Sequence, residues 1–123
     1  MLYHGQVDEA ASFTRRAMRL NPHYPSQYAA VLGQAYYFSG QYHEAASVLE
    51  DAVSRNSTRL ASRVFLVATL SHLGRLEDAR WEASELLTLD RGFVADEVAR
   101  AFPIRDPDLL ARLTHDLRQA GLK

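Results

Sequence analysis

Gly40-Gln41-Tyr42-His43-Glu44-Ala45 is the most informative segment of the chain, because two other segments repeat its pattern. Residues 5–10 read Gly-Gln-Val-Asp-Glu-Ala, and residues 74–79 read Gly-Arg-Leu-Glu-Asp-Ala. The three glycines are therefore 35 and then 34 residues apart. A period of roughly 20 to 50 residues is typical of repeat units that must stack, because no single unit buries its own apolar face. The sequence predicts a repeat protein.

Helical periodicity fills the segments between the glycines. Leu66, Leu70 and Leu73 recur at spacings of four and three residues, which places them on one helical face. Gly40 and Gly74 stand where a helix must end and turn back, a position that favours a residue able to adopt positive φ. The pattern predicts an all-α chain, with helices over residues 6–20, 26–39, 42–55, 59–73, 76–89, 93–101 and 107–120.

Gly33 is different, because it lies inside a predicted helix. Glycine there costs about 1 kcal/mol relative to alanine. We expect the compensation to be a close approach of the following helix at Ala45.

Residues 1–93 resemble the tetratricopeptide repeat, a helix-turn-helix unit of about 34 residues. The middle unit carries most of the family's signature positions, namely Leu32, Gly33, Tyr36, Gly40, Ala45, Leu49 and Ala52. The resemblance implies a right-handed α-solenoid of antiparallel helix pairs with a C-terminal capping helix. It implies one domain over 1–123, with an incomplete repeat at 1–25, repeats at 26–59 and 60–93, and a cap at 94–123.

The predicted cap contains a helix with clear start signals. Asp106 can cap its N-terminus and Pro107 suits its first turn. An apolar stripe should then close the stack, formed by Leu109, Leu110, Leu113 and Leu117. Arg112, Asp116 and Arg118 are expected to face elsewhere. Segments 102–107 and 117–122 also resemble the ends of bacterial repeat proteins with a nucleotide-cyclase domain upstream, which implies an alternative role as the regulatory or dimerising module of a signalling protein.

In the tetratricopeptide family, the first helix of each unit lines a concave groove that binds a protein or peptide partner. The resemblance therefore implies a groove lined by Gln27, Ala30, Gln34, Tyr37, Phe38, Val64, Ala68, Ser71 and His72. Tyr36 matches a core position of the family, and three consecutive residues do not share one face, so Tyr37 or Phe38 should reach the groove. Members that bind a C-terminal carboxylate use lysine, arginine and asparagine at positions where this chain has Ala30, Gln34, Val31, Ala61 and Phe65. We therefore expect an apolar, amide-lined groove.

The predicted helix 6–20 carries Phe13, Ala17 and Leu20 on one side, and residues 1–4 supply only the last turn of the helix that should cover them. An uncovered apolar stripe is an interaction site by default. We therefore expect self-association, as a homodimer through the N-terminal end.

Composition and motifs argue against several other classes. With 14 basic and 15 acidic residues, the chain lacks the basic excess of nucleic-acid-binding domains. No apolar run approaches the roughly 20 residues that span a bilayer, so we expect no membrane partner and a cytoplasmic location. Glycine-rich phosphate loops and nucleophile elbows are missing, and the five histidines are scattered. We expect no catalytic site, no metal and no cofactor.

Overall fold

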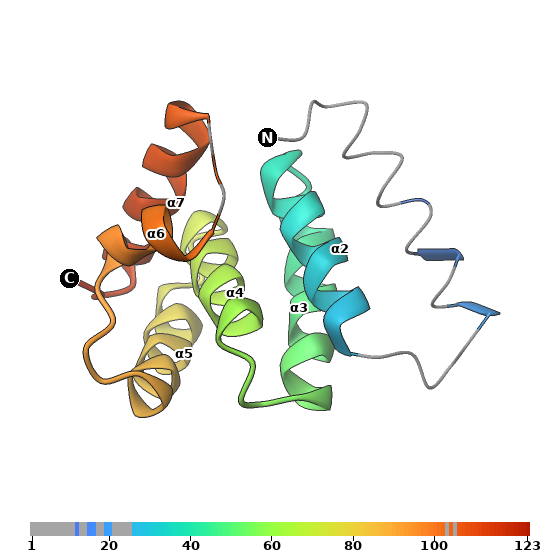
Figure 1. Cartoon of the computed structure of the whole chain (residues 1–123), viewed down its shortest axis with the longest axis horizontal. Helices are drawn as coiled ribbons and strands as arrows, with labels where there is room; N and C mark the ends of the chain where they lie inside the picture. Colours follow the sequence, from blue (N-terminus) through green and yellow to red (C-terminus); the bar gives the residue numbers. More distant parts are fainter. Residues whose placement is uncertain (1–11, 13–14, 17–18, 21–25, 103, 105) are drawn as a thin grey trace.

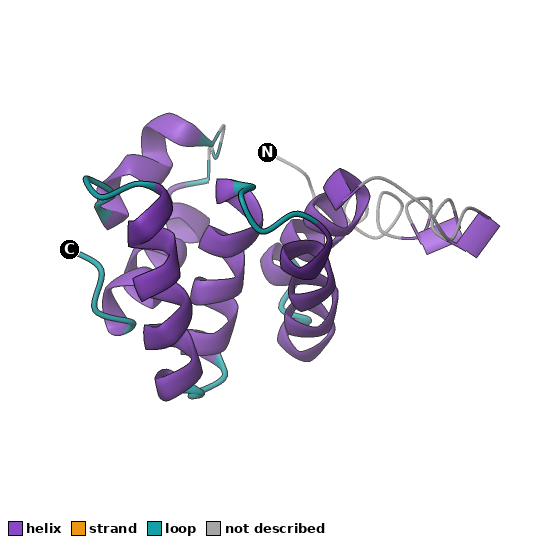
Figure 2. Cartoon of the chain, turned by 90° about the horizontal axis from the view of Figure 1, so that it is seen from below, coloured by secondary structure: helices purple, strands orange, loops and turns teal. Residues whose placement is uncertain are grey.

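The computed structural model describes residues 12, 15–16, 19–20, 26–102, 104 and 106–123, and every regular element among them is a helix (Figures 1 and 2). The elements are α2 (Ser26–Phe38), α3 (Tyr42–Arg55), α4 (Leu60–His72), α5 (Leu76–Leu89), the 3-10 helix η1 (Ala95–Glu97), α6 (Val98–Ala101) and α7 (Pro107–Gln119). The predicted all-α fold is confirmed. Of the predicted helix 6–20, residues 12, 15–16 and 19–20 are described, and they are helical.

Neighbouring helices pack as pairs along the chain. α2 packs on α3, and α4 packs on α5. α3 also packs on α4, and this contact joins the two pairs. Figure 1 shows these four helices side by side, with α6 and α7 above α5 and next to α4. α7 packs mainly on α4 and therefore closes the stack on that side.

The turns after α2 and α4 have the same geometry, as the repeated glycines predict. Gly40 has a φ of 83° and Gly74 a φ of 80°. In each turn the glycine N–H bonds to the carbonyl three residues earlier, and the next N–H bonds to the carbonyl five residues earlier. This is the Schellman pattern, which satisfies the last carbonyls of a helix and reverses the chain. Gly121 ends α7 in the same way, with a φ of 97°.

α4 is the centre of the molecule. Every residue from Ser62 to Ser71 is buried, because α2, α3, α5 and α7 all pack against this helix. A helix that is enclosed on all sides can be apolar on all sides, and residues 64–68 are an unbroken apolar run. Arg63 is the charged exception, and its Nη1 lies 2.7 Å from Glu82 Oε2 on α5.

The segment before α6 differs from the predicted helix 93–101. Val94 is extended, with φ −126° and ψ 154°, and the helical part begins only with η1 at Ala95. Phe93 and Ala95 are both buried in the core. The chain therefore crosses the core surface in an extended conformation before it can become helical.

The Asp106 cap predicted for α7 is confirmed. Its Oδ1 accepts the backbone N–H of Asp108 at 2.9 Å, and Pro107 occupies the first turn. Leu113 and Leu117 are buried, and Leu110 packs against the core. The expectation that Asp116 faces elsewhere is wrong, because this residue is only 3% exposed.

Gly33 is needed because α3 crosses α2 closely, as predicted, but the neighbour is Leu49 rather than Ala45. A Cβ placed on Gly33 would overlap Cγ and Cδ2 of Leu49. Leu49 is fully buried in the core, so its side chain has little room to move away.

We predict that Gly33→Ala lowers the free energy of unfolding by about 1–3 kcal/mol, the usual cost of overpacking a core. Urea denaturation followed by circular dichroism measures the change. Gly92→Ala is the matched control, because its added Cβ would meet only Asp90 Oδ1 at 3.9 Å. Equal stability of the two variants would contradict the close approach of α2 and α3.

Candidate functional site

The side chains predicted to line the groove separate into a buried group and an accessible group. Ala30, Tyr37, Val64, Ala68 and Ser71 are at most 5% exposed. Gln27 is exposed, and Gln34 and Phe38 are half-buried. His72 keeps 36% of its side chain accessible.

The expected exposure of the buried group is wrong, for a reason that lies in the packing of α4. Val64, Ala68 and Ser71 belong to α4, which four helices enclose. Ala30 and Tyr37 belong to α2, which packs on both α3 and α4. The first helices of the two pairs therefore contact each other and α7, instead of lining an open groove.

A carboxylate from α7 joins the first helices of both pairs. The hydroxyl of Tyr37 on α2 donates a hydrogen bond to Asp116 Oδ2 at 2.6 Å. Nδ1 of His72 on α4 lies 3.2 Å from the same oxygen. One buried oxygen atom thus ties together α2, α4 and α7.

Tyr37 is suited to be a permanent donor in this contact. Burial raises the pKa of the Tyr37 hydroxyl far above its ordinary value, and the hydrogen bond to Asp116 and the negative charge of Asp116 raise it further. The phenol therefore keeps its proton. Because the acceptor is a carboxylate, the bond is of the stronger, charge-assisted kind.

Aromatic rings surround the Asp116 contact. The Tyr42 ring stacks on His72 with centroids 3.8 Å apart, and Arg112 on α7 donates to the Tyr42 hydroxyl at 3.3 Å. On the other side of Tyr37, its ring meets Phe65 of α4 edge to face at 5.8 Å. The aromatic cluster thus fills the junction of α2, α4 and α7 and does not form an open ligand pocket.

The accessible part of α2 includes one large apolar side chain that is more than half exposed. Val31 is 51% exposed. Gln27 and Gln34 lie four residues before and three residues after it, so all three share one face of the helix. We call these three residues the α2 face. It has the apolar, amide-lined character predicted for the groove, although it is narrower than the predicted surface.

The residues predicted for self-association are mostly not described. Phe13 and Ala17 lie outside the described residues, whereas Leu20 is described and is 80% exposed. Most of the apolar surface of Leu20 is therefore available for a partner.

Sequence reasoning missed Asp116 and Trp81. Asp116 follows Leu113 by three residues and therefore lies on the same helical face, a signal that was present in the sequence. Trp81 on α5 is 60% exposed, and nothing in the repeat pattern distinguishes it from a core residue.

The described residues hold no cluster of three or more histidine, aspartate or glutamate side chains that would suit a metal ion. None of the helices among the described residues is long and apolar enough to cross a membrane. His72 and Asp116 are used to hold helices together.

Comparison with known families adds one match. The family model described as anaphase-promoting complex, cyclosome, subunit 3 matches residues 3–82, which is more than half of the chain. This is a tetratricopeptide-type repeat family. The matched region includes α2, α3, α4 and the first half of α5. No curated protein shows a significant match to the chain.

We predict that Tyr37→Phe destabilises the protein by about 1.5–3 kcal/mol, because it removes a buried hydrogen bond to a charged acceptor. Tyr42→Phe is the matched control, since it removes an exposed hydrogen bond and should cost less than about 0.5 kcal/mol. Urea denaturation of both variants measures the difference. Similar losses for the two would show that the Asp116 contact does not hold α7 in place.

Proposed function

The chain belongs to the family of anaphase-promoting complex, cyclosome, subunit 3, a tetratricopeptide-type repeat family, and on this basis we propose that it is a module that binds a protein partner through the α2 face. Families of this type are protein-interaction scaffolds and are typically non-catalytic. The division into repeats at 26–59 and 60–93 with a cap at 94–123 belongs to this proposal, as does a cytoplasmic location.

The observation that carries the proposal is the exposure of Val31, an apolar side chain, on a helix whose other side is buried. Seven residues of α2 are buried, so the helix is firmly held and its free face is rigid. Val31 offers apolar contact area at 51% exposure. Gln27 and Gln34 offer amide donors and acceptors on either side of it. Such a surface suits an extended or helical segment that brings one apolar side chain and free backbone polar groups.

Self-association is a second candidate, favoured by the exposure of Leu20. At 80% exposure, this side chain leaves almost all of its apolar area in water, and burying it against a second copy of the chain would be favourable. We propose that Phe13 and Ala17 take part in the same homodimer contact.

The C-terminal resemblance supports an alternative setting for the same binding role. We propose, as this alternative, that the module regulates or dimerises a larger signalling protein such as a nucleotide cyclase. Support comes from the sequence of segments 102–107 and 117–122 alone. The coding sequence upstream of Met1 tests it directly, since a catalytic domain in the same reading frame is expected, and an unrelated upstream sequence would contradict it.

We predict that Val31→Glu weakens partner binding at least about ten-fold, because a charge replaces the central apolar contact. The partner is first represented by a peptide selected from a phage-displayed library on the intact chain, and its affinity is then measured by calorimetry. Ser54→Glu is the control, because Ser54 is exposed on α3. Unchanged affinity of Val31→Glu, with unchanged helicity, would reject the α2 face as the binding surface.

A separate prediction concerns Leu20. Sedimentation equilibrium should show a reversible dimer at tens of micromolar, and Leu20→Glu should raise the dissociation constant at least about ten-fold by placing a charge in the apolar contact. Ser54→Glu again serves as the control. A monomer over the whole concentration series would exclude the homodimer. It would not affect the proposal that the α2 face binds a partner.

A further inference from the structure

A second exposed surface lies on α5, around the only tryptophan of the chain. Trp81 is 60% exposed, although tryptophan offers more contact area than most side chains and is enriched at interface hot spots. Helical spacing places Asp78 and Glu85 on the same face of α5 as Trp81, three residues before it and four residues after it. The indole ring is therefore flanked by a carboxylate on either side along its own helix.

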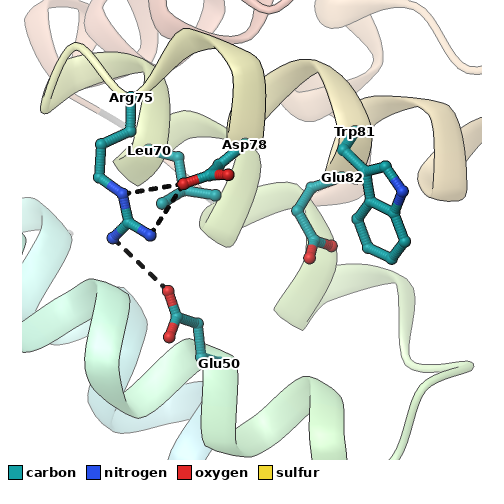
Figure 3. Close-up of a pocket in the computed structure, with 6 residues that line it drawn as sticks. All are labelled: Glu50, Leu70, Arg75, Asp78, Trp81 and Glu82. Carbon is teal, nitrogen blue, oxygen red and sulfur yellow. Dashed lines mark hydrogen bonds and ion pairs between the residues drawn. The ribbon is translucent and has the colours of Figure 1, made fainter.

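A hollow of about 220 Å³ opens beside Trp81, between α5 and α3 (Figure 3). Its lining consists of Glu50 from α3, Leu70 from α4, Arg75 from the preceding turn, and Asp78, Trp81 and Glu82 from α5. Sites for drug-sized molecules usually enclose roughly 300–1,000 Å³. The smaller hollow is suited to one side chain.

Arg75 neutralises one end of the hollow. Its Nη2 lies 3.0 Å from Asp78 Oδ2, and its Nη1 lies 3.6 Å from Glu50 Oε1. Figure 3 shows Arg75 between these two carboxylates, whereas Trp81 and Glu82 lie beside each other farther along α5. Arg75 is the one cation in the lining of the hollow, against the three carboxylates of Glu50, Asp78 and Glu82.

The Trp81 end has a surplus of negative charge. Glu82 is paired with Arg63 at 2.7 Å, yet its pKa is raised, first by burial and then by the negative charges of Glu85 and Glu50, against the opposing effect of Arg63. A further positive charge near Glu82 would therefore stabilise the ionised form of its carboxylate. Trp81 is 60% exposed, so much of its indole surface is accessible to a cation from a partner.

We propose that this hollow receives an arginine side chain from a basic segment of a partner protein. The planar guanidinium would lie on the Trp81 indole and approach the carboxylates of Glu82 and Glu50. Arginine suits this surface better than lysine, because the guanidinium stacks on aromatic faces and forms forked hydrogen bonds with carboxylates. The hollow lies on α3 and α5 and is independent of the α2 face.

Trp81 makes the test direct, because all tryptophan emission of the chain comes from this residue. The probe is an acetylated and amidated peptide, Ala-Leu-Arg-Leu-Arg-Ala. The matched peptide carries citrulline, which has the shape of arginine without its charge. The arginine peptide should change the emission saturably, and the citrulline peptide should bind at least about ten-fold more weakly. Equal effects of the two peptides, or no change in emission, would overturn the proposal.

Two further variants should change the affinity for the arginine peptide in opposite directions, and a third serves as the control. Glu50→Gln combined with Asp78→Asn should weaken the arginine peptide about ten-fold, whereas Arg75→Gln should tighten it about three-fold, because a competing cation leaves the hollow. Glu44→Gln is the control, since Glu44 is exposed in the first turn of α3. A folding defect is not expected to tighten binding. Weaker binding of Arg75→Gln, or unchanged binding of the double variant, would also overturn the proposal.

Discussion

The complete enclosure of α4 is the constraint on which the rest of the structure depends. Ten consecutive residues of this helix are buried, so each neighbouring helix must present an apolar face to it. α2, α3 and α5 supply three of these faces, and the glycine turns at Gly40 and Gly74 join them into antiparallel pairs. α7 supplies the fourth with Leu113 and Leu117. The repeated turns therefore matter because they bring each helix back against α4.

Polar contacts decide where α7 lies on α4, because leucines alone bind a helix without fixing its register. A buried carboxylate is costly unless it is hydrogen-bonded. Asp116 finds its donor at Tyr37 and a second contact at His72, and a shift of α7 by one turn would lose both. The side of α4 that a following repeat or a partner would otherwise use is thereby occupied by the chain itself. This occupation explains why Tyr37, Val64 and Ala68 are core residues.

The sequence was sufficient for α2 to α5, α7 and the turns between the pairs, and insufficient for the segment before α6 and for the groove. Positions that act locally were predictable: Gly40 and Gly74 take positive φ and Asp106 caps α7, because these roles depend on the nearest few residues. The neighbour of Gly33 was misassigned by one helical turn, from Leu49 to Ala45, because the register between two helices depends on their crossing. The extent of the groove was overestimated, because the sequence of the leucine stripe on α7 does not indicate which surface of the other helices it covers. No local sequence pattern indicated that Trp81 would be exposed.

A rigid centre also affects how the remaining surfaces bind. Binding costs free energy when loops or side chains must become ordered, and less when the surface is already fixed. Val31 lies on a helix with seven buried residues, and Leu70, the floor of the hollow beside Trp81, is 2% exposed. Both surfaces are therefore backed by the core around α4. Their chemistry differs, since one is apolar with amides and the other is aromatic with carboxylates. If both proposals hold, two segments of different composition bind the same module without competing, because they contact separate helices.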